Sequence, residues 1–329
     1  GYTFSSDTDT EVIVHLLDHT LKTQPDLAAA LKIAVKQLHG AYGLAVISAK
    51  QPDRILAARS DSPLVIGLGL GENFLASDQL ALRQVTDRFM YLEEGDIAEI
   101  TRDSVQIWDV SGAPVTREQV QYHEGAEAAD KGEFRHFMLK EIHEQPSVVQ
   151  RTLEGRLGED HVLVQAFGPQ AAEIFAKAKN IQIVACGTSY HAGMVARYWL
   201  EELAGIPCQI EVASEFRYRK VVVQPDTLFV SISQSGETAD TLAALRNAKD
   251  LSPGNGGYLA SLAICNVGIS SLVRESDLTL LTLAGPEIGV ASTKAFTTQL
   301  VALMLLTLAL GRVRGTLEPK VEAELVAEL

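Results

Sequence analysis

Four short apolar segments alternate with helical patterns in the second half of the chain, and this alternation limits the possible folds more than any other feature. The segments are apolar on both faces, which is typical of strands in a parallel sheet that is covered on both sides. The expected strands are 181–185, 227–232, 259–265 and 278–283. The expected helices are 189–203, 237–249 and 293–310. This order predicts an α/β fold with a doubly wound parallel sheet.

The first 110 residues follow a different pattern. Apolar residues at helical spacing predict helices at 11–22 and 27–38. Short strands follow at 41–48, 54–58, 63–69, 73–76, 89–92, 96–100 and 104–110. Such sequential strands favour antiparallel pairing in an α+β layer. Small and polar residues at 124–135 then indicate a linker, and a helix is expected at 136–153, with Pro146 marking a break or restart.

Composition narrows the classes of function. A length of 329 residues is typical of about two domains. The formal net charge of −14 is a poor match to nucleic acid or to an anionic membrane. The longest apolar run, 300–310, is too short to cross a bilayer and predicts a buried helix. Three cysteines without zinc-like spacing favour reduced thiols and a cytoplasmic location.

Two loops rich in hydroxyl groups come directly after expected strands and lead into expected helices, at 186–190 and 233–238. A helix N-terminus offers unpaired N–H groups and a partial positive charge, and glycine lets the backbone approach a ligand closely. Two such loops at consecutive strand ends therefore indicate a phosphate site. The alternative is that Thr188 and Ser235 are ordinary helix N-caps. Neither loop matches a nucleotide-binding fingerprint.

Two further features have a structural and a functional interpretation. The segment 287–294 opens the last apolar helix, so Ser292 or Thr293 could cap that helix, or the segment could form a wall of the same site. His15 and His19 have a metal-compatible i, i+4 spacing, but the stretch lacks the Glu of H-E-x-x-H. Packing or surface histidines are therefore favoured, and no metal site is expected.

Several strings resemble one family. The segments 186–190, 213–219, 233–242, 262–266 and 287–299 are similar to the first sugar-isomerase (SIS) domain of the glutamine–fructose-6-phosphate aminotransferase family. Strings at 8–12, 40–43, 57–60, 63–67 and 94–98 resemble the second half of that family's glutaminase domain. The SIS loops alone are only moderately specific. The combination with the glutaminase strings is highly specific, and it covers nearly the whole chain.

The resemblance implies a domain organisation. Residues 1–123 would form the C-terminal part of a glutamine amidotransferase domain, an α+β layer of the Ntn type. A linker at 124–135 would lead to the first SIS domain with its leading helix at 136–315, and residues 316–329 would begin a helix toward a second SIS domain. The family is expected to act as a homodimer through its SIS domains.

The resemblance also implies an activity and its residues. The family makes glucosamine 6-phosphate from fructose 6-phosphate and glutamine, without a cofactor. By motif, the phosphate would be bound by Ser189, Ser233, Gln234, Ser235 and Thr238, the sugar contacted by Thr188, Val290 and Ser292, and the glutamine α-amino group held by Asp9. A carboxylate such as that of Asp9 complements an ammonium group.

The chain lacks the family's N-terminal nucleophilic Cys and the second SIS domain, with its isomerase Glu, His and Lys. No catalytic residue is therefore assigned, and an internal fragment that is inactive in both half-reactions is expected. Two other interpretations remain open. One is a non-catalytic SIS module that senses sugar phosphates, and the other is an SIS enzyme of the deglycase type. The strings at 8–10 and 94–98 favour the aminotransferase over both.

Overall fold

The computed structural model describes all residues except 84, 122–129 and 252–256, and it divides into two compact units, Gly1–Glu127 and Ala128–Leu329. Half of the predicted linker, residues 124–129, therefore lies outside the described residues. The proposed domain boundaries remain a prediction. Each unit has its own hydrophobic core, and each is described by itself below.

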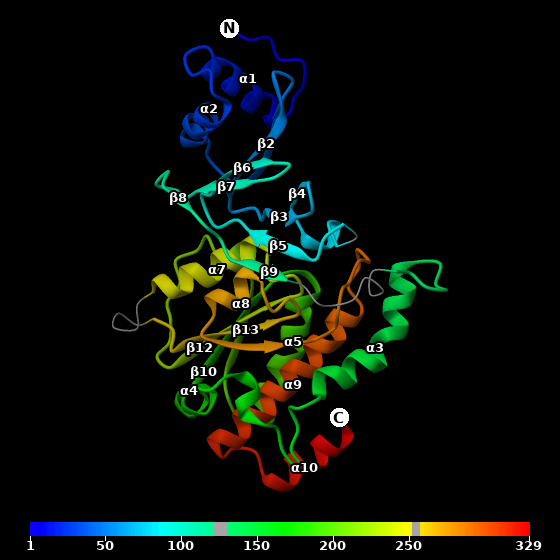
Figure 1. The fold of residues 1–329 in the computed structure, drawn as a ribbon. Coiled ribbons are helices and arrows are strands. Elements are labelled where there is room, and N and C mark those ends of the chain that lie inside the picture. The colour runs from blue at the N-terminus through cyan, green and yellow to red at the C-terminus, as the bar shows by residue number, and fades with distance from the viewer. Residues whose placement is uncertain (84, 122–129, 252–256) are drawn as a thin grey trace. The chain divides into compact units, whose positions relative to one another are not determined.

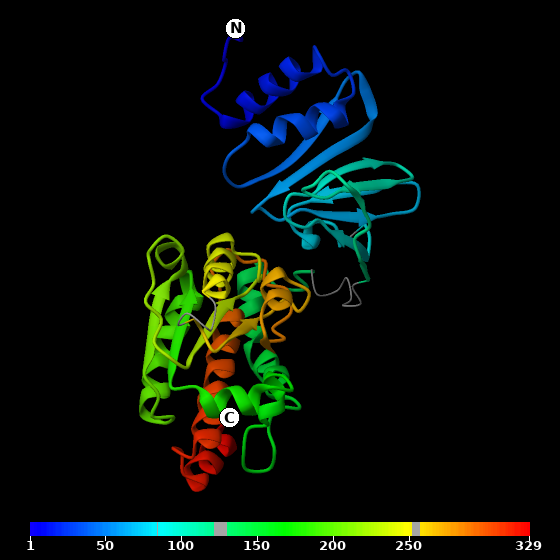
Figure 2. The same cartoon turned by 90° about the vertical axis from the view of Figure 1, so that its left-hand side faces the viewer.

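The N-terminal unit places two helices on a pair of antiparallel sheets, as Figure 2 shows. The helices are α1 (Asp9–Leu21) and α2 (Leu27–Ala34), the latter extended by the 3₁₀ turn Val35–Gln37. One sheet has the order β1 (Tyr42–Ser48), β2 (Gln51–Ser60), β6 (Ile97–Thr101), β7 (Val105–Trp108), β8 (Pro114–Val115). The other has the order β4 (Asn73–Ala76), β3 (Val65–Leu68), β5 (Arg88–Tyr91), β9 (Gln119–Gln121). The pairing in these two sheets is antiparallel, as predicted.

Alternating side chains of β2 explain these layers. Leu56 and Ala58 pack with Leu17 and Leu31 of the two helices. Ala57, between them in sequence, joins the second core cluster, which includes Ile66 of the other sheet. Successive side chains of a strand point to opposite faces, so one strand contributes to both layers.

The C-terminal unit is a five-stranded parallel sheet with helices on both faces (Figure 1). The sheet order is β11 (Cys208–Val212), β10 (Asn180–Ala185), β12 (Thr227–Ser233), β13 (Ala260–Cys265), β14 (Leu278–Leu281). The helices are α3 (Phe137–Leu153), α4 (Ala171–Lys177), α5 (Gly187–Glu202), α6 (Ala213–Phe216), α7 (Ala239–Asp250), α8 (Ser271–Glu275), α9 (Lys294–Arg314) and α10 (Pro319–Glu328). Two short 3₁₀ turns are Gln79–Ala81 in the first unit and Val164–Phe167 in this one. The predicted parallel α/β arrangement is confirmed, although the edge strand β11 was not predicted.

The sheet is buried on both faces because its strands alternate between two core clusters. Ile183 and Val230 face α5 and α9 in one cluster. Phe229 and Ala263 face α6 and α7 in the other. The strands read as continuous apolar runs because neither face meets water.

Helix α9 is the central helix of the larger core. By length and composition it could cross a membrane, but Leu303, Leu306 and Leu310 are fully buried against the sheet and its neighbours. The prediction of a buried helix at 300–310 is therefore confirmed. Gly315, with a φ of 70°, ends α9 in the left-handed conformation that favours glycine, and Pro319 begins α10.

The expected break at Pro146 was wrong, because α3 continues through it to Leu153. A proline inside a helix removes one backbone N–H donor and crowds the preceding turn. Contacts on both sides of the proline hold the helix together. Glu144 pairs with Lys294 before it, and the buried Thr152 donates to the carbonyl of Thr282 after it.

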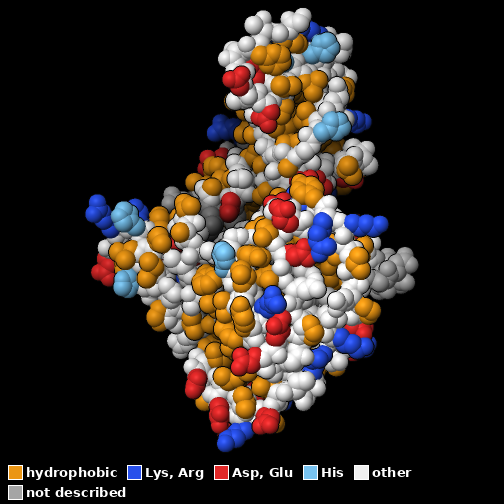
Figure 3. All heavy atoms as spheres, turned by 180° about the vertical axis from the view of Figure 1, so that it is seen from behind, with side chains coloured by type: hydrophobic (Ala, Val, Ile, Leu, Met, Phe, Trp, Pro, Cys, Tyr) orange, Lys and Arg blue, Asp and Glu red, His pale blue; other side chains and the backbone are white. Residues whose placement is uncertain are grey.

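Charge is mixed over the surface. On the face shown in Figure 3, the described Lys and Arg side chains are scattered among Asp and Glu and form no continuous basic patch. The basic and aromatic stretch 214–220 is partly neutralised within the fold, where Arg219 pairs with Glu211 and Arg217 with Asp240.

Candidate functional site

The two hydroxyl-rich segments follow the neighbouring parallel strands β10 and β12, at the point where the strand order reverses. From β10 the chain crosses through α5 to the edge strand β11, and β12 then lies on the other side of β10. Helix α5 packs on one face of the sheet and α7 on the other. Adjacent strands whose connections leave to opposite faces open a crevice at their carboxyl ends, where ligands bind in sheets of this kind.

The β12–α7 loop, residues 234–238, folds around the hydroxyl of Ser233. Ser233 Oγ accepts a hydrogen bond from the Gly236 N–H at 2.9 Å and lies 3.2 Å from Thr238 Oγ1. Ser235 Oγ accepts from the Glu237 N–H at 3.2 Å. Three of the predicted phosphate-binding hydroxyls are thus gathered in one turn. The segment 233–238 contains no Lys or Arg, so a bound anion there would depend on hydroxyl and N–H donors.

Gly236 allows the tight packing of this loop. Its φ is +67°, and a Cβ built on it would lie 2.1 Å from Ser270 Oγ and 2.7 Å from Cys265 Sγ. The Glu237 carboxylate turns toward α8, where its Oε1 accepts from the Ser271 N–H at 2.7 Å. The loop therefore rests on the residues that follow β13. Burial raises the pKa of the Cys265 thiol, so this support stays uncharged.

The interpretation of Thr188 and Ser235 as ordinary N-caps was wrong. The N-cap of α5 is Cys186 and that of α7 is Thr238, and neither side chain caps its helix. Thr238 contacts Ser233 instead. Ser189 is buried in the first turn of α5, whereas Thr188 is exposed. Both helices therefore begin at the carboxyl edge of the sheet without a capping N-cap side chain, a geometry suited to an anion.

The β14–α9 loop, residues 282–293, lies at the same edge of the sheet. Asn266, just after β13, ties it down: its side chain accepts from the Ala284 N–H at 2.7 Å and donates to the Gly285 carbonyl at 2.7 Å. The Thr282 N–H also donates to the carbonyl of Cys265 at 2.9 Å. The two loops are thus linked through residues 265–270.

Thr293, one of the two residues expected to cap α9, is its N-cap residue, but its side chain makes no capping hydrogen bond, and Glu287 caps the helix instead. Its carboxylate accepts from the N–H groups of Thr293 at 2.8 Å and Ala295 at 3.1 Å, and from Ser292 Oγ at 2.9 Å. A carboxylate also complements the positive end of the helix dipole. Ser292 is therefore oriented by Glu287, while the side chain of Val290 is fully exposed.

Helix α3 supplies supports that sequence reasoning missed. Glu141, which is 2% exposed, accepts from the Ile288 N–H at 2.6 Å and the Gly289 N–H at 3.0 Å. The buried Lys294 pairs with Glu144 at 2.6 Å, and Thr297 Oγ1 donates to Gln145 Oε1 at 2.7 Å. In the sequence these residues look like the polar face of an amphipathic helix. The one local signal is Lys294 itself, a charged residue at the start of an otherwise apolar helix, which needs a partner if it is buried.

The remaining predicted residues lie elsewhere or are less constrained. Gln234 is half-buried in the β12–α7 loop, and its carbonyl lies 3.8 Å from Cys265 Sγ. Asp9 is an exposed residue at the start of α1 in the N-terminal unit. Its neighbour Glu11 accepts hydrogen bonds from Ser5 and Ser6, which lower the pKa of its carboxyl to about 2.

Of the two histidines on α1, His15 has a packing role and His19 is exposed. The ring of His15 stacks on Tyr2 with 4.6 Å between centroids and meets the edge of Phe4 at 4.9 Å. Its Nε2 lies 3.4 Å from Glu11. Among the residues that the structure describes, no group of three or more His, Cys, Asp or Glu side chains is placed to hold a metal ion.

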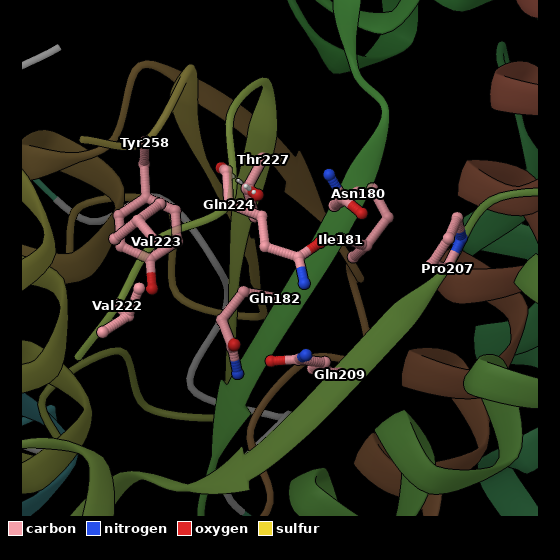
Figure 4. Close-up of a pocket in the computed structure, with 10 residues that line it drawn as sticks. All are labelled: Asn180, Ile181, Gln182, Pro207, Gln209, Val222, Val223, Gln224, Thr227 and Tyr258. Atoms are coloured by element: carbon pink, nitrogen blue, oxygen red, sulfur yellow. Dashed lines mark hydrogen bonds between the residues drawn. The ribbon is translucent and has the colours of Figure 1, made fainter. Parts of the chain in front are cut away.

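Two hollows lie at the opposite, amino-terminal edge of the sheet. Figure 4 shows the smaller, about 70 Å³, which lies beside Asn180 and Thr227, where β10 and β12 begin, and carries the amide side chains of Gln182 and Gln209. The larger, about 560 Å³, is lined by α4, the end of α7 and the start of β13. We place the candidate site at the carboxyl edge, because the hydroxyl loops and helix N-termini converge there and offer anion-binding groups.

Most of the C-terminal unit matches a known domain family. An SIS domain model matches residues 174–309, which include β10 to β14 and both loops. The glutamine–fructose-6-phosphate aminotransferase (isomerizing) of Pseudomonas putida is 85% identical over 329 residues, covering 100% of this chain and 53% of that relative. The chain belongs to the glutamine–fructose-6-phosphate aminotransferase family.

Other members of the aminotransferase family agree. The relative from Idiomarina loihiensis is 61% identical over 323 residues, 98% of this chain and 52% of that protein. The solved C-terminal domain of the glucosamine-fructose-6-phosphate aminotransferase from Francisella tularensis is 52% identical with a TM-score of 0.58, covering 60% of this chain and 54% of that chain. The present chain thus spans about half the length of the curated relatives it matches.

Proposed function

We propose that this chain forms part of an enzyme that converts fructose 6-phosphate and glutamine into glucosamine 6-phosphate, and that its carboxyl-edge loops bind the sugar phosphate. Family membership supports the reaction, because the full-length relatives carry that name. The location rests on one observation. The hydroxyls of Ser233, Ser235 and Thr238 gather in one turn at the carboxyl end of β12, and Ser189 follows the carboxyl end of the neighbouring strand β10.

The proposed contacts fall into a phosphate group and a sugar group. Ser189, Ser233, Gln234, Ser235 and Thr238 would surround the phosphate, with the N-termini of α5 and α7 adding favourable dipoles. Thr188, Val290 and Ser292 would contact the sugar. The exposure of Val290 supports this role, because an apolar side chain without packing partners is free to meet a ligand.

The N-terminal unit is proposed to be the C-terminal part of an Ntn-type glutaminase domain, with Asp9 holding the α-amino group of glutamine. Its antiparallel sheets covered by α1 and α2 are compatible with that assignment. The chain on its own is proposed to bind sugar phosphate without turnover and without a cofactor. Assembly as a homodimer through the SIS domain and a cytoplasmic location remain parts of the proposal.

Thermal unfolding with increasing fructose 6-phosphate tests the site. A ligand that binds only the folded chain raises the free energy of unfolding by RT ln(1 + [L]/Kd), about 2.7 kcal/mol at a hundredfold excess over Kd. Ser235→Asp places a carboxylate where the phosphate should bind, so its melting temperature should not respond. Ser147→Asp adds the same charge at an exposed position on α3 and should respond like the parent chain.

Two results would contradict the proposal. One is a parent chain that shows no shift while circular dichroism reports a folded α/β protein. The other is an equal shift in the parent and in Ser235→Asp, which would place the bound sugar phosphate elsewhere on the chain.

A further inference from the structure

Glu141 is a buried carboxylate with an unusual pair of partners. It lies on α3, is 2% exposed, and accepts the backbone N–H groups of Ile288 and Gly289, which lie 147 and 148 residues later in the chain. Burying a carboxylate is costly unless donors replace its water. Hydrogen bonds to a charged acceptor are among the stronger ones in proteins. This contact therefore fixes the loop backbone to the helix.

The loop lies directly on the helix at this point. A Cβ built on Gly289 would lie 2.5 Å from Glu141 Oε2 and 3.4 Å from Met138 Cα. Val290 comes next and has a fully exposed side chain. Since that side chain is not held by packing, its position depends on the backbone that Glu141 anchors immediately before it.

The same face of α3 also holds the start of α9. Glu144 and Gln145, three and four residues after Glu141, contact Lys294 at 2.6 Å and Thr297 at 2.7 Å. Residues at these spacings share one face of a helix. Helix α3 thus fixes the backbone on both sides of the segment that includes Val290 and Ser292.

We propose that Glu141 is a positioning residue that sets the affinity of the site for the sugar part of its ligand and leaves the phosphate part unaffected. This inference rests on the proposed function, in which Val290 and Ser292 contact the sugar. The phosphate part is independent because the β12–α7 loop is held by Ser233 and by residues 265–271, without a hydrogen bond from α3 among the described residues.

The test compares two ligands, fructose 6-phosphate and inorganic phosphate, by isothermal titration of the full 329-residue chain. Glu141→Ala should weaken fructose 6-phosphate binding by about tenfold, as expected for losing hydrogen bonds to a charged group. Its affinity for inorganic phosphate should stay within about twofold of the parent, because the phosphate loop is held by other residues.

Two further variants separate positioning from a loss of folding. Glu141→Gln keeps Oε1, which accepts both N–H groups, and should restore most of the affinity for fructose 6-phosphate. Gly289→Ala leaves Glu141 in place but pushes the loop from it, and should show the same sugar-selective loss as Glu141→Ala. Gln150→Ala, at an exposed position on the same helix, is the control and should bind both ligands like the parent.

Each outcome has one meaning. If the parent chain does not bind fructose 6-phosphate, the proposed function of this chain fails. If the parent binds it and both Glu141→Ala and Gly289→Ala bind it equally well, the role of Glu141 is refuted. An equal loss of fructose 6-phosphate and inorganic phosphate would also overturn the inference, because it would show a general structural role.

Discussion

The two loops at the carboxyl edge of the sheet are held in opposite ways. The β12–α7 loop is organised by its own hydroxyls and by residues about thirty positions further along the chain, such as Ser270 and Ser271. The β14–α9 loop is tied by Asn266 as well, but it also needs Glu141 of α3, about 150 residues earlier. Glu144 and Gln145 of the same helix hold the start of α9. One part of the site is thus built mainly from local chemistry, and the other by a distant helix.

The largest expected loss of stability comes from a change in the β12–α7 loop. Gly236→Ala forces a side chain into a left-handed conformation and against Ser270 and Cys265. Together the strain and the overpacking should lower the free energy of unfolding by about 4 kcal/mol and abolish the ligand-induced stabilisation. Chemical denaturation with and without fructose 6-phosphate measures both.

Gly155→Ala is the matched control for that change. Gly155 has a similar φ of +70°, but a Cβ built there meets nothing within 4 Å. Only the conformational strain remains, so the cost should be about 1 kcal/mol. Equal losses in the two variants would show that packing around Gly236 is not what holds the β12–α7 loop.

A smaller loss of stability is expected from a change in α3. Glu144→Ala leaves the Lys294 ammonium, whose side chain is 4% exposed, without its carboxylate. Removing one partner of a buried ion pair should lower the free energy of unfolding by about 3 kcal/mol. The double variant Glu144→Ala with Lys294→Met removes the stranded charge and should recover much of that loss in urea denaturation. A double variant less stable than Glu144→Ala would argue against this explanation.

The smallest effect concerns the reactivity of the cysteines, of which Cys265 reports how tightly the β12–α7 loop is packed. Burial raises the pKa of Cys265 beneath the β12–α7 loop and that of Cys208 to about 12, so both stay as thiols at pH 8. Cys186, at the start of α5, is only partly buried. Iodoacetamide at pH 8 should therefore modify Cys186 at least about tenfold faster than the other two, as followed by peptide mass spectrometry. Equal rates would mean that the β12–α7 loop opens readily.

The difference between the loops also explains what the sequence could predict. Strand–loop–helix order and hydroxyl-rich strand ends are local patterns, so the parallel sheet and the segment 233–238 could be found from them. Glu141 could not, because a carboxylate on an amphipathic helix looks the same whether it faces water or a loop 147 residues away. The edge strand β11 is short and only partly buried, and its periodicity was too weak to identify it.

Pro146 failed as a signal for a related reason. A proline usually ends or kinks a helix because of its own geometry. Here contacts with residues around 282 and 294 hold both halves of α3, and such contacts are invisible in the local sequence. The capping of α9 by Glu287 was not predicted either, since it depends on how the loop folds back.

The contacts of α3 have a consequence for the order in which the chain folds. The SIS match begins at residue 174, after α3 has ended, yet the β14–α9 loop reaches its place only when residues 141 and 288 meet. Contacts between segments so far apart form late, because the chain between them must be ordered first. The β12–α7 loop needs only its neighbouring strands. The β12–α7 loop should therefore form before the β14–α9 loop. On partial unfolding, the β14–α9 loop should be the first of the two to be lost.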